Sequence, residues 1–220
     1  MPLLFWVSVF LAYFLGAIPI GVLISRKFSK VDVRLYGSGN TGAANVLRTS
    51  GKAAGGLVFL GDMMKGSAAV LAAGWIVGDA SFAAGGLLFN ADIARVTAGL
   101  AAIIGHNWSV FLKFHGGKGV STFFGSLVTM SPLIGLTSGA VTIIVMAIFR
   151  YVSLGSILGA VFSVVFLLPL TVLGWQSEIF FFFTLPAMAV IVVQHRTNIH
   201  RLLSGTETKL GEKGKPVFKP

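Results

Sequence analysis

The chain has 220 residues, of which 55% are hydrophobic and only 11% are charged. Soluble domains carry about 25% charged residues, so this composition, with a mean hydropathy of +0.88, excludes a soluble protein and indicates an integral membrane protein. The absence of cysteine excludes disulfides, a thiol nucleophile and a cysteine-bound metal. The net charge of +10 does not require nucleic acid as a partner, because basic loops beside membrane spans and contact with anionic membrane lipids explain it.

Apolar stretches of about 20 residues cross a bilayer as helices, and their distribution predicts an all-α membrane protein with seven transmembrane helices. In chain order the predicted spans cover residues 3–25, 55–78, 96–111, 120–130, 133–149, 154–173 and 179–193. The apolar stretch 120–149 is too long for one straight helix, and Pro132 breaks it because proline cannot donate a helical hydrogen bond. If the chain were only kinked at Pro132, the count would be six.

Basic residues predict the orientation. In the seven-span arrangement, 15 of the 17 Lys and Arg residues fall on one side. An excess of Lys and Arg marks the cytoplasmic loops, so the N-terminus is predicted outside and the C-terminus in the cytoplasm. Six spans would put basic loops on both sides, which favours seven. We expect residues 1–205 to form one multi-pass membrane domain and residues 206–220 a short basic cytoplasmic tail.

The first polar motif follows the first span and reads GSGNTGAANVLR at positions 37–48. Its GxGxxG spacing also occurs in dinucleotide-binding folds, but those need a preceding strand, whereas a membrane helix precedes this motif. Backbone N–H groups of glycine loops can form a nest for an anion, and arginine can bind phosphate with two N–H groups. We therefore expect an anion site here, with an ordinary glycine-rich turn as the alternative. The candidate residues are Gly37, Ser38, Gly39, Asn40, Asn45 and Arg48.

The second polar motif is a glycine-rich loop that precedes the fourth span, with Gly116, Gly117, Lys118 and Gly119 in sequence. A nucleotide-binding P-loop needs glycine at position 112, which is leucine here, so that class is excluded. Glycine lets a ligand approach the backbone, and helix N-termini attract anions. The loop therefore predicts a second anion contact; the alternative is a turn whose lysine reaches the membrane surface.

The third polar motif, at positions 195–201, begins where the last span ends. His195, Asn198 and Arg201 are three residues apart and share a face if the segment is helical, and Arg196 lies beside them. An interfacial anchor is the alternative interpretation. His195 and His200 are five apart, which is unsuitable for a helical metal pair, so we expect no metal.

Asp62 and Lys65 are charged residues inside the second predicted span. Charged residues within a membrane are functional candidates by default, so this pair is either a structural ion pair or a support for the site. His106, at the end of the third span, is a candidate hydrogen-bonding partner. No histidine is followed by aspartate at the His-x4-Asp spacing common among acyltransferases. An enzyme with this sequence would therefore rely on positioning and charge stabilisation.

Together, the motifs resemble those of the bacterial acyl-phosphate:glycerol-3-phosphate acyltransferases, the PlsY family. The GSGN segment with its following Arg48, the GGKGV segment and the HRTNIHRL segment with a following GTE occur in the family's order over nearly the whole chain. Ala44 stands where the family commonly has Thr, Thr41 where Pro or Ile is common, and Ser109 where Pro is frequent, but none of these departures removes an expected charge.

The resemblance implies transfer of a fatty acyl group from acyl phosphate to the 1-hydroxyl of glycerol 3-phosphate, giving lysophosphatidic acid and phosphate for phospholipid biosynthesis in the bacterial inner membrane. It implies that the substrate phosphate takes the hydroxyl proton and that Glu207 supports the tail. The catalytic residues would be Ser38, Arg48, Lys118 and His195. The substrate-binding residues would be Gly37, Gly39, Asn40, Asn45, Gly116, Gly117, Gly119, Asn198 and Arg196.

The expected partners are glycerol 3-phosphate, a long-chain acyl phosphate and membrane lipids, without a cofactor, and the protein is expected to be a monomer. Apolar helix faces would hold the acyl tail, each buried methylene contributing about 0.8 kcal/mol. A membrane transporter for phosphate or an organic phosphate is the alternative, but transporters favour mid-membrane sites. Here the candidate residues gather at one membrane face. A scaffold protein would not require Lys118 among three glycines.

Overall fold

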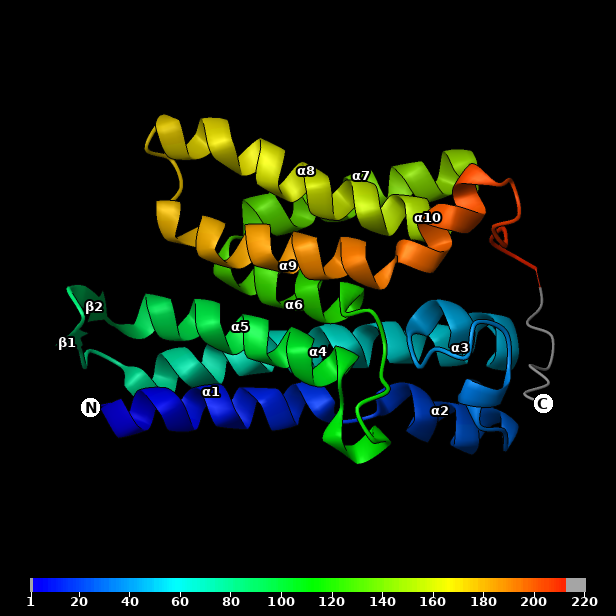
Figure 1. Cartoon of the computed structure of the whole chain (residues 1–220), viewed down its shortest axis with the longest axis horizontal. Coiled ribbons are helices and arrows are strands. Elements are labelled where there is room, and N and C mark those ends of the chain that lie inside the picture. The colour runs from blue at the N-terminus through cyan, green and yellow to red at the C-terminus, as the bar shows by residue number, and fades with distance from the viewer. Residues whose placement is uncertain (1, 213–220) are drawn as a thin grey trace.

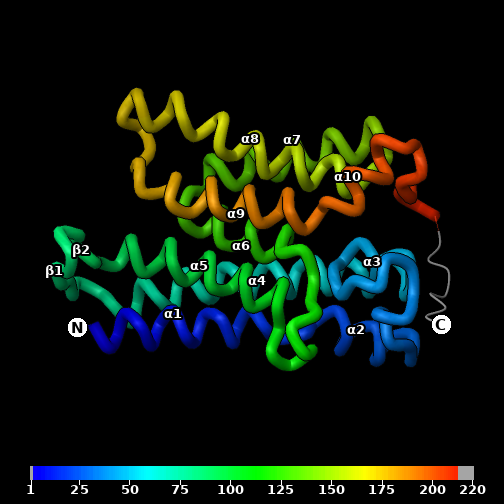
Figure 2. Tube along the Cα trace, viewed as in Figure 1, coloured from blue at the N-terminus to red at the C-terminus, as the bar shows by residue number. Residues whose placement is uncertain are grey.

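Long apolar helices lie side by side along one axis in the computed structural model, which describes residues 2–212 (Figures 1 and 2). The helices are α1 (Pro2–Ala17), α2 (Ile20–Ser29), α3 (Ala43–Ser50), α4 (Lys52–Val77), α5 (Ala91–Asn107), α6 (Val120–Met130), α7 (Pro132–Phe149), α8 (Val152–Val172), α9 (Phe181–Gln194) and α10 (Arg196–Leu203). Short 3₁₀ turns cover Val33–Leu35, Val110–Leu112 and Glu178–Phe180. Positions 213–220 of the predicted tail lie outside the described residues.

Prolines divide the apolar stretches. The predicted break at Pro132 is confirmed, because α6 ends at Met130 and Pro132 starts α7, where proline's missing N–H costs nothing. A second break was not predicted: α1 ends at Ala17, and α2 begins after Pro19. The two helices together still have the length and apolarity of one membrane span.

Within the described residues 2–212, four helical stretches are long and apolar enough to cross a membrane, namely residues 2–29, α4, α7 and α8. The bent pair α9 and α10, whose axes differ by 59°, gives a fifth candidate. With 17 and 11 residues, α5 and α6 are shorter than the roughly 20 residues that span a bilayer. These helices confirm a mostly helical integral membrane protein.

A two-stranded antiparallel hairpin, β1 (Phe82–Ala84) and β2 (Leu87–Phe89), joins α4 to α5 and was not predicted. Its strands have three residues each, too few for an alternating pattern to be recognised. The rings of Phe82 and Phe89 stack at 4.8 Å, and both rings pack edge-on against Phe5 of α1. The hairpin therefore closes the end of the bundle where α1 begins (Figure 1).

Glycines allow the closest helix contacts. Gly105 of α5 lies against the Tyr13 carbonyl of α1, and Gly125 of α6 lies against the Met63 carbonyl of α4, with no room for a side chain at either glycine. Small residues let membrane helices approach in this way. These contacts hold α5 against α1 and α6 against α4, and the second polar motif lies in the segment between α5 and α6.

Glycine pairs four residues apart occur in α7 and α8 but have different surroundings. Gly155 and Gly159 of α8 both lie against α7. Gly135 of α7 packs against Val128, but a Cβ at Gly139 would meet no atom within 4 Å. Gly139 therefore faces open space rather than a neighbouring helix.

Candidate active site

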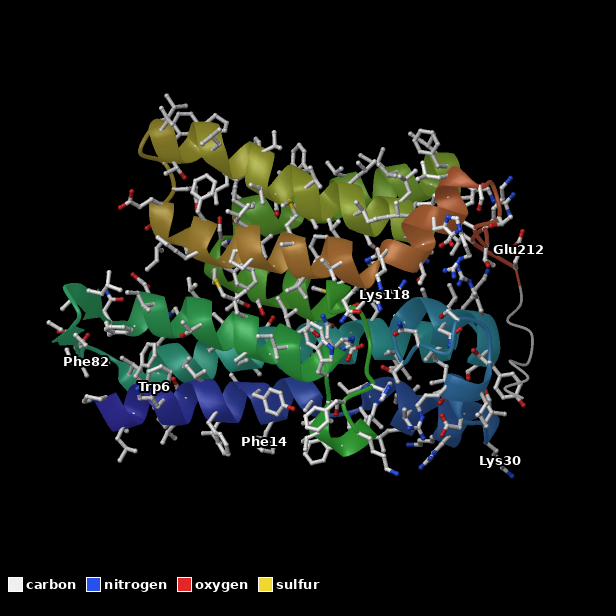
Figure 3. The ribbon with its side chains drawn as sticks, in the orientation of Figure 1. Trp6, Phe14, Lys30, Phe82, Lys118 and Glu212 are labelled. Atoms are coloured by element: carbon white, nitrogen blue, oxygen red, sulfur yellow. The ribbon has the colours of Figure 1, made fainter. Side chains whose placement is uncertain are left out.

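The three polar motifs meet around one cavity of about 740 Å³. In Figure 3, Lys30, Lys118 and Glu212 lie toward one end of the bundle, and Trp6 and Phe82 lie toward the other. The polar part of the cavity wall comes from the 37–48 segment, the glycine loop, the start of α8, the junction of α9 with α10 and the following segment. Its polar lining residues include Ser38, Asn40, Asn45, Arg48, Lys118, Ser153, His195, Asn198 and Glu207.

Asn45 organises the first motif. Its Nδ2 lies 3.0, 2.9 and 2.8 Å from the carbonyls of Val33, Tyr36 and Asn40, and its Oδ1 accepts a hydrogen bond of 3.1 Å from the Ser38 N–H. Gly37 and Gly39 adopt left-handed φ values of 59° and 69°, which glycine tolerates without strain. These two glycines shape the loop and do not line the cavity, whereas Ser38 and Asn40 do.

The second motif is attached to the end of α5. Gly116 donates its N–H to the Asn107 carbonyl and Gly117 donates to the His106 carbonyl, both at 3.0 Å. These N–H groups are therefore engaged within the protein rather than directed into the cavity. Gly119, with a φ of 79°, caps α6 and lines the cavity beside Lys118.

Lys118 is held by a chain of hydrogen bonds that ends at one carboxylate. Its Nζ donates to Asn198 Oδ1, and Asn198 Nδ2 donates to Glu207 Oε1 at 2.6 Å. Ser153 donates to the same oxygen and Arg201 Nε donates to Oε2, each at 2.7 Å. Burial alone would raise the pKa of Glu207, but these three hydrogen bonds lower it below the ordinary value.

The cations of the site are partly desolvated. Burial lowers the pKa of Lys118 to about 8, so its charge is retained at neutral pH but lost in mildly alkaline solution. Arg48 of α3 lines the cavity and donates to the Thr208 carbonyl at 3.3 Å. Burial lowers the pKa of Arg48, yet arginine remains charged in proteins.

His195 lies in the break between α9 and α10, outside both helices. Its Nδ1 lies 2.8 Å from the Ile191 carbonyl, which can only accept, so Nδ1 carries the proton. Burial, followed by the charge of Lys118, lowers the pKa of His195 to about 4. The imidazole is therefore neutral at physiological pH, and its Nε2 is a hydrogen-bond acceptor.

The structure brings together most of the predicted residues but not all of them. Ser38, Asn40 and Asn45 with Arg48, Lys118, Gly119, His195 and Asn198 line the cavity, whereas Gly37, Gly39, Gly116 and Gly117 lie behind its wall. Arg196 is exposed, donates to the Val193 carbonyl at 3.3 Å and does not line the cavity. The sequence assigned Glu207 only to the tail and gave no signal for Ser153, because its partner is 54 residues away.

The rest of the cavity is an apolar groove that is open on one side, since Leu136 and Ile143 are 64% and 67% exposed. Its walls come from α4, α6 and α7, with Phe59, Met63, Phe124, Val128, Leu136, Ala140, Ile143 and Met146. Gly139 opens this part of the space. A cavity with cations and amides in one part and an apolar groove in the other suits an amphiphile with an anionic head.

The family follows from comparison with known proteins. The sequence model described as glycerol-3-phosphate acyltransferase matches residues 6–205. The chain belongs to the glycerol-3-phosphate acyltransferase family. Glycerol-3-phosphate acyltransferase 3 of Dehalococcoides mccartyi (strain CBDB1) is 44% identical, over 94% of this chain and 96% of the relative. The glycerol-3-phosphate acyltransferase of Thermoanaerobacter pseudethanolicus is 43% identical, over 92% and 94%.

Solved structures of the acyltransferase family have the same fold. The crystal structure of PlsY, an integral membrane glycerol 3-phosphate acyltransferase, in its glycerol 3-phosphate form superposes with a TM-score of 0.80 at 38% identity, covering 94% of this chain and 96% of PlsY. The lysophosphatidic acid form gives 0.78 at 36% identity, covering 94% and 95%. The resemblance to the PlsY family inferred from the motifs is therefore confirmed.

Replacing Glu207 with glutamine should destabilise the protein in a pH-dependent way. A carboxylate whose pKa is lowered by folding contributes stability above its unfolded pKa, about 4.3, and loses it as the pH falls through the folded value. The melting temperature of Glu207→Gln in detergent should therefore be lower than that of the wild type near pH 7, and the difference should shrink below about pH 4. The exposed Glu178→Gln serves as the control, and a difference that grows on acidification would contradict the assignment.

Proposed function

We propose that this member of the acyltransferase family takes its acyl group from a long-chain acyl phosphate and transfers it to the 1-hydroxyl of glycerol 3-phosphate. The products would be lysophosphatidic acid and inorganic phosphate. One observation carries the proposal: the cationic motifs and the apolar walls belong to a single cavity. That arrangement would hold the phosphates beside Lys118 and Arg48 while the acyl tail lies between α4, α6 and α7.

In this proposal the protein orients two substrates and balances their charge. The hydroxyl oxygen attacks the acyl carbonyl carbon, and its proton passes to an oxygen of the acyl phosphate. The bond from the carbonyl carbon to the phosphate oxygen then breaks, and phosphate leaves with the proton. Lys118 and Arg48 would stabilise the negative charge that collects on the phosphates, with Ser38 as a further hydrogen-bonding group.

His195 suits a positioning role rather than that of a strong base. With a pKa of about 4, its imidazole has little affinity for the proton of an alcohol. Its Nε2 can instead accept a hydrogen bond from the hydroxyl and fix the direction of attack. This property supports transfer of the proton to the substrate phosphate.

We propose that the chain crosses the bacterial inner membrane seven times, through α1 with α2, α4, α5, α6, α7, α8 and α9, with the N-terminus outside. The positive-inside rule then puts the site in the cytoplasm. Residues 1–205 would form the membrane domain of a monomer, and the tail beginning at residue 206 would contribute Glu207 to the site. The shortness of α5 and α6 is compatible with crossing, because their polar ends meet loops and the cavity rather than lipid.

A donor comparison tests the reaction. Purified protein given glycerol 3-phosphate and a long-chain acyl phosphate should release phosphate and form lysophosphatidic acid in equal amounts, because each transfer breaks one acyl–phosphate bond. Acyl-CoA, which lacks that bond, should give neither product. Activity with acyl-CoA alone would overturn the proposed donor, and no product with either donor would overturn the reaction. The transporter alternative has no support in the family to which the chain belongs.

Lys118→Ala should lower kcat/KM about 100-fold or more, because a charge-stabilising donor is lost at the reacting centre. In the wild type, kcat/KM should fall as the pH rises above about 8, where Lys118 of the free enzyme loses its proton. Lys118→Arg keeps its charge and should abolish this alkaline decline, even if its turnover is lower. The exposed Lys113→Ala should retain the wild-type profile; an alkaline decline preserved in Lys118→Arg would exclude Lys118 as its cause.

Gly139→Leu should shift the preference toward shorter acyl chains, because a leucine side chain would fill open space in the apolar groove of the cavity. The measurement is kcat/KM for a series of acyl phosphates of increasing length. Ala147→Leu adds similar bulk at an exposed position of the same helix that does not line the cavity. An unchanged chain-length profile for Gly139→Leu would show that the acyl tail does not reach this position.

A further inference from the structure

A charged cluster lies inside the bundle beside the proposed site without taking part in its chemistry. Asp62 and Lys65 of α4 are 1% and 5% exposed, and His106 of α5 is 7% exposed. Lys65 Nζ lies 2.8 Å and His106 Nδ1 lies 3.5 Å from the same oxygen, Oδ1 of Asp62. Removing such charges from water costs several kcal/mol per ion, so an ion pair that only neutralises itself is a poor reason for their presence.

The cluster connects two irregular parts of the backbone. On one side Lys65 donates to the Ile18 carbonyl at 3.2 Å, in the break between α1 and α2. On the other side the His106 ring lies directly beneath Gly117, so closely that a Cβ at Gly117 would overlap its Nε2. The backbone N–H of Gly117 also bonds to the His106 carbonyl. The imidazole is thus held between the Asp62 carboxylate and the glycine loop.

Gly117 directly precedes Lys118. The position and orientation of the His106 ring therefore determine the backbone position from which the Lys118 side chain extends. Both Asp62 and His106 also border the main cavity. We propose that Asp62 is a positioning residue that, with its charge balanced by Lys65, orients the His106 ring so that this ring supports Gly117 and holds Lys118 at the cavity mouth. The proposal rests on the proposed role of Lys118 in binding the substrate phosphates.

Two double variants separate positioning from simple charge neutralisation. Asp62→Leu with Lys65→Met replaces both charges with apolar groups of similar size, which buried pairs often tolerate. Asp62→Asn with Lys65→Met is equally uncharged but keeps an oxygen acceptor facing His106 Nδ1. Removing Asp62 alone is less informative, because it would leave the Lys65 charge buried without a partner.

We expect the Leu/Met double variant to fold but to lose about tenfold or more in kcat/KM for glycerol 3-phosphate, as displacement of a binding group predicts. The Asn/Met variant should recover most of that loss. A matched control is Asp92→Leu with Arg95→Met, which removes an exposed ion pair of the same spacing and the same 2.8 Å separation at the other end of α5. This control should retain wild-type kinetics.

Wild-type kinetics in the Leu/Met variant, or equal losses in both double variants, would overturn the proposal. If the Leu/Met variant does not fold, Gly117→Ala tests the same contact, because its methyl group would collide with His106 and displace Lys118; unchanged kinetics there would also overturn it. Calorimetric binding of glycerol 3-phosphate separates the two inferences. A wild type that binds without acyl transfer contradicts the proposed reaction, whereas equal binding by wild type and Leu/Met variant contradicts positioning by Asp62.

Discussion

The arrangement of the site depends on the Glu207 carboxylate, which receives hydrogen bonds from Ser153 of α8 and from Asn198 and Arg201 of α10. Without these donors a buried carboxylate would lose its hydration without compensating hydrogen bonds. With them it fixes the Asn198 amide, whose oxygen receives Lys118 from a loop 80 residues earlier. The Glu207 carboxylate thereby connects the tail, α8, α10 and the glycine loop through hydrogen bonds, and these elements form one polar wall of the cavity. It offsets only part of the local positive charge, so the mouth retains net attraction for phosphate.

Glycine has two opposite uses in the bundle. At Gly105 and Gly125 the missing side chain lets one helix contact the backbone carbonyl of another, so that α5 packs closely on α1 and α6 on α4. At Gly139 the missing side chain leaves space that no neighbour fills. Tight contact between α4 and α6 on one side and open space beside α7 on the other form the apolar groove of the cavity. Sequence spacing alone cannot tell these uses apart, since Gly135 and Gly139 form the same small-residue pattern as Gly155 and Gly159.

Features encoded by local chemistry could be predicted from the sequence. The apolar stretches, the break at Pro132 and the three basic motifs depend on residues that are neighbours in the chain, and the structure has them near the expected positions. Helix α3 could not be recognised, because its eight residues follow a glycine-rich turn that suggested a loop. The positions of Glu207 in the cavity wall and of Arg196 outside it could not be predicted, for a common reason. Which side chains meet in the cavity depends on the 59° bend between α9 and α10, and residue types alone do not reveal that bend.

The pairing of Asp62 with His106 also depends on how helices pack and not on residues that are neighbours in the chain. A search for histidine and aspartate at a fixed spacing finds no pair, yet helix packing brings these two together from positions 44 residues apart. Their geometry differs from that of a general base, because the imidazole is covered by Gly117 rather than open to an attacking hydroxyl. The other histidine of the site, His195, is buried and has a pKa too low for that task. Both histidines therefore favour orientation over proton abstraction. An already activated acyl donor requires no more than orientation and balanced charge, and a rigid glycine loop supported by a buried imidazole is suited to supply both.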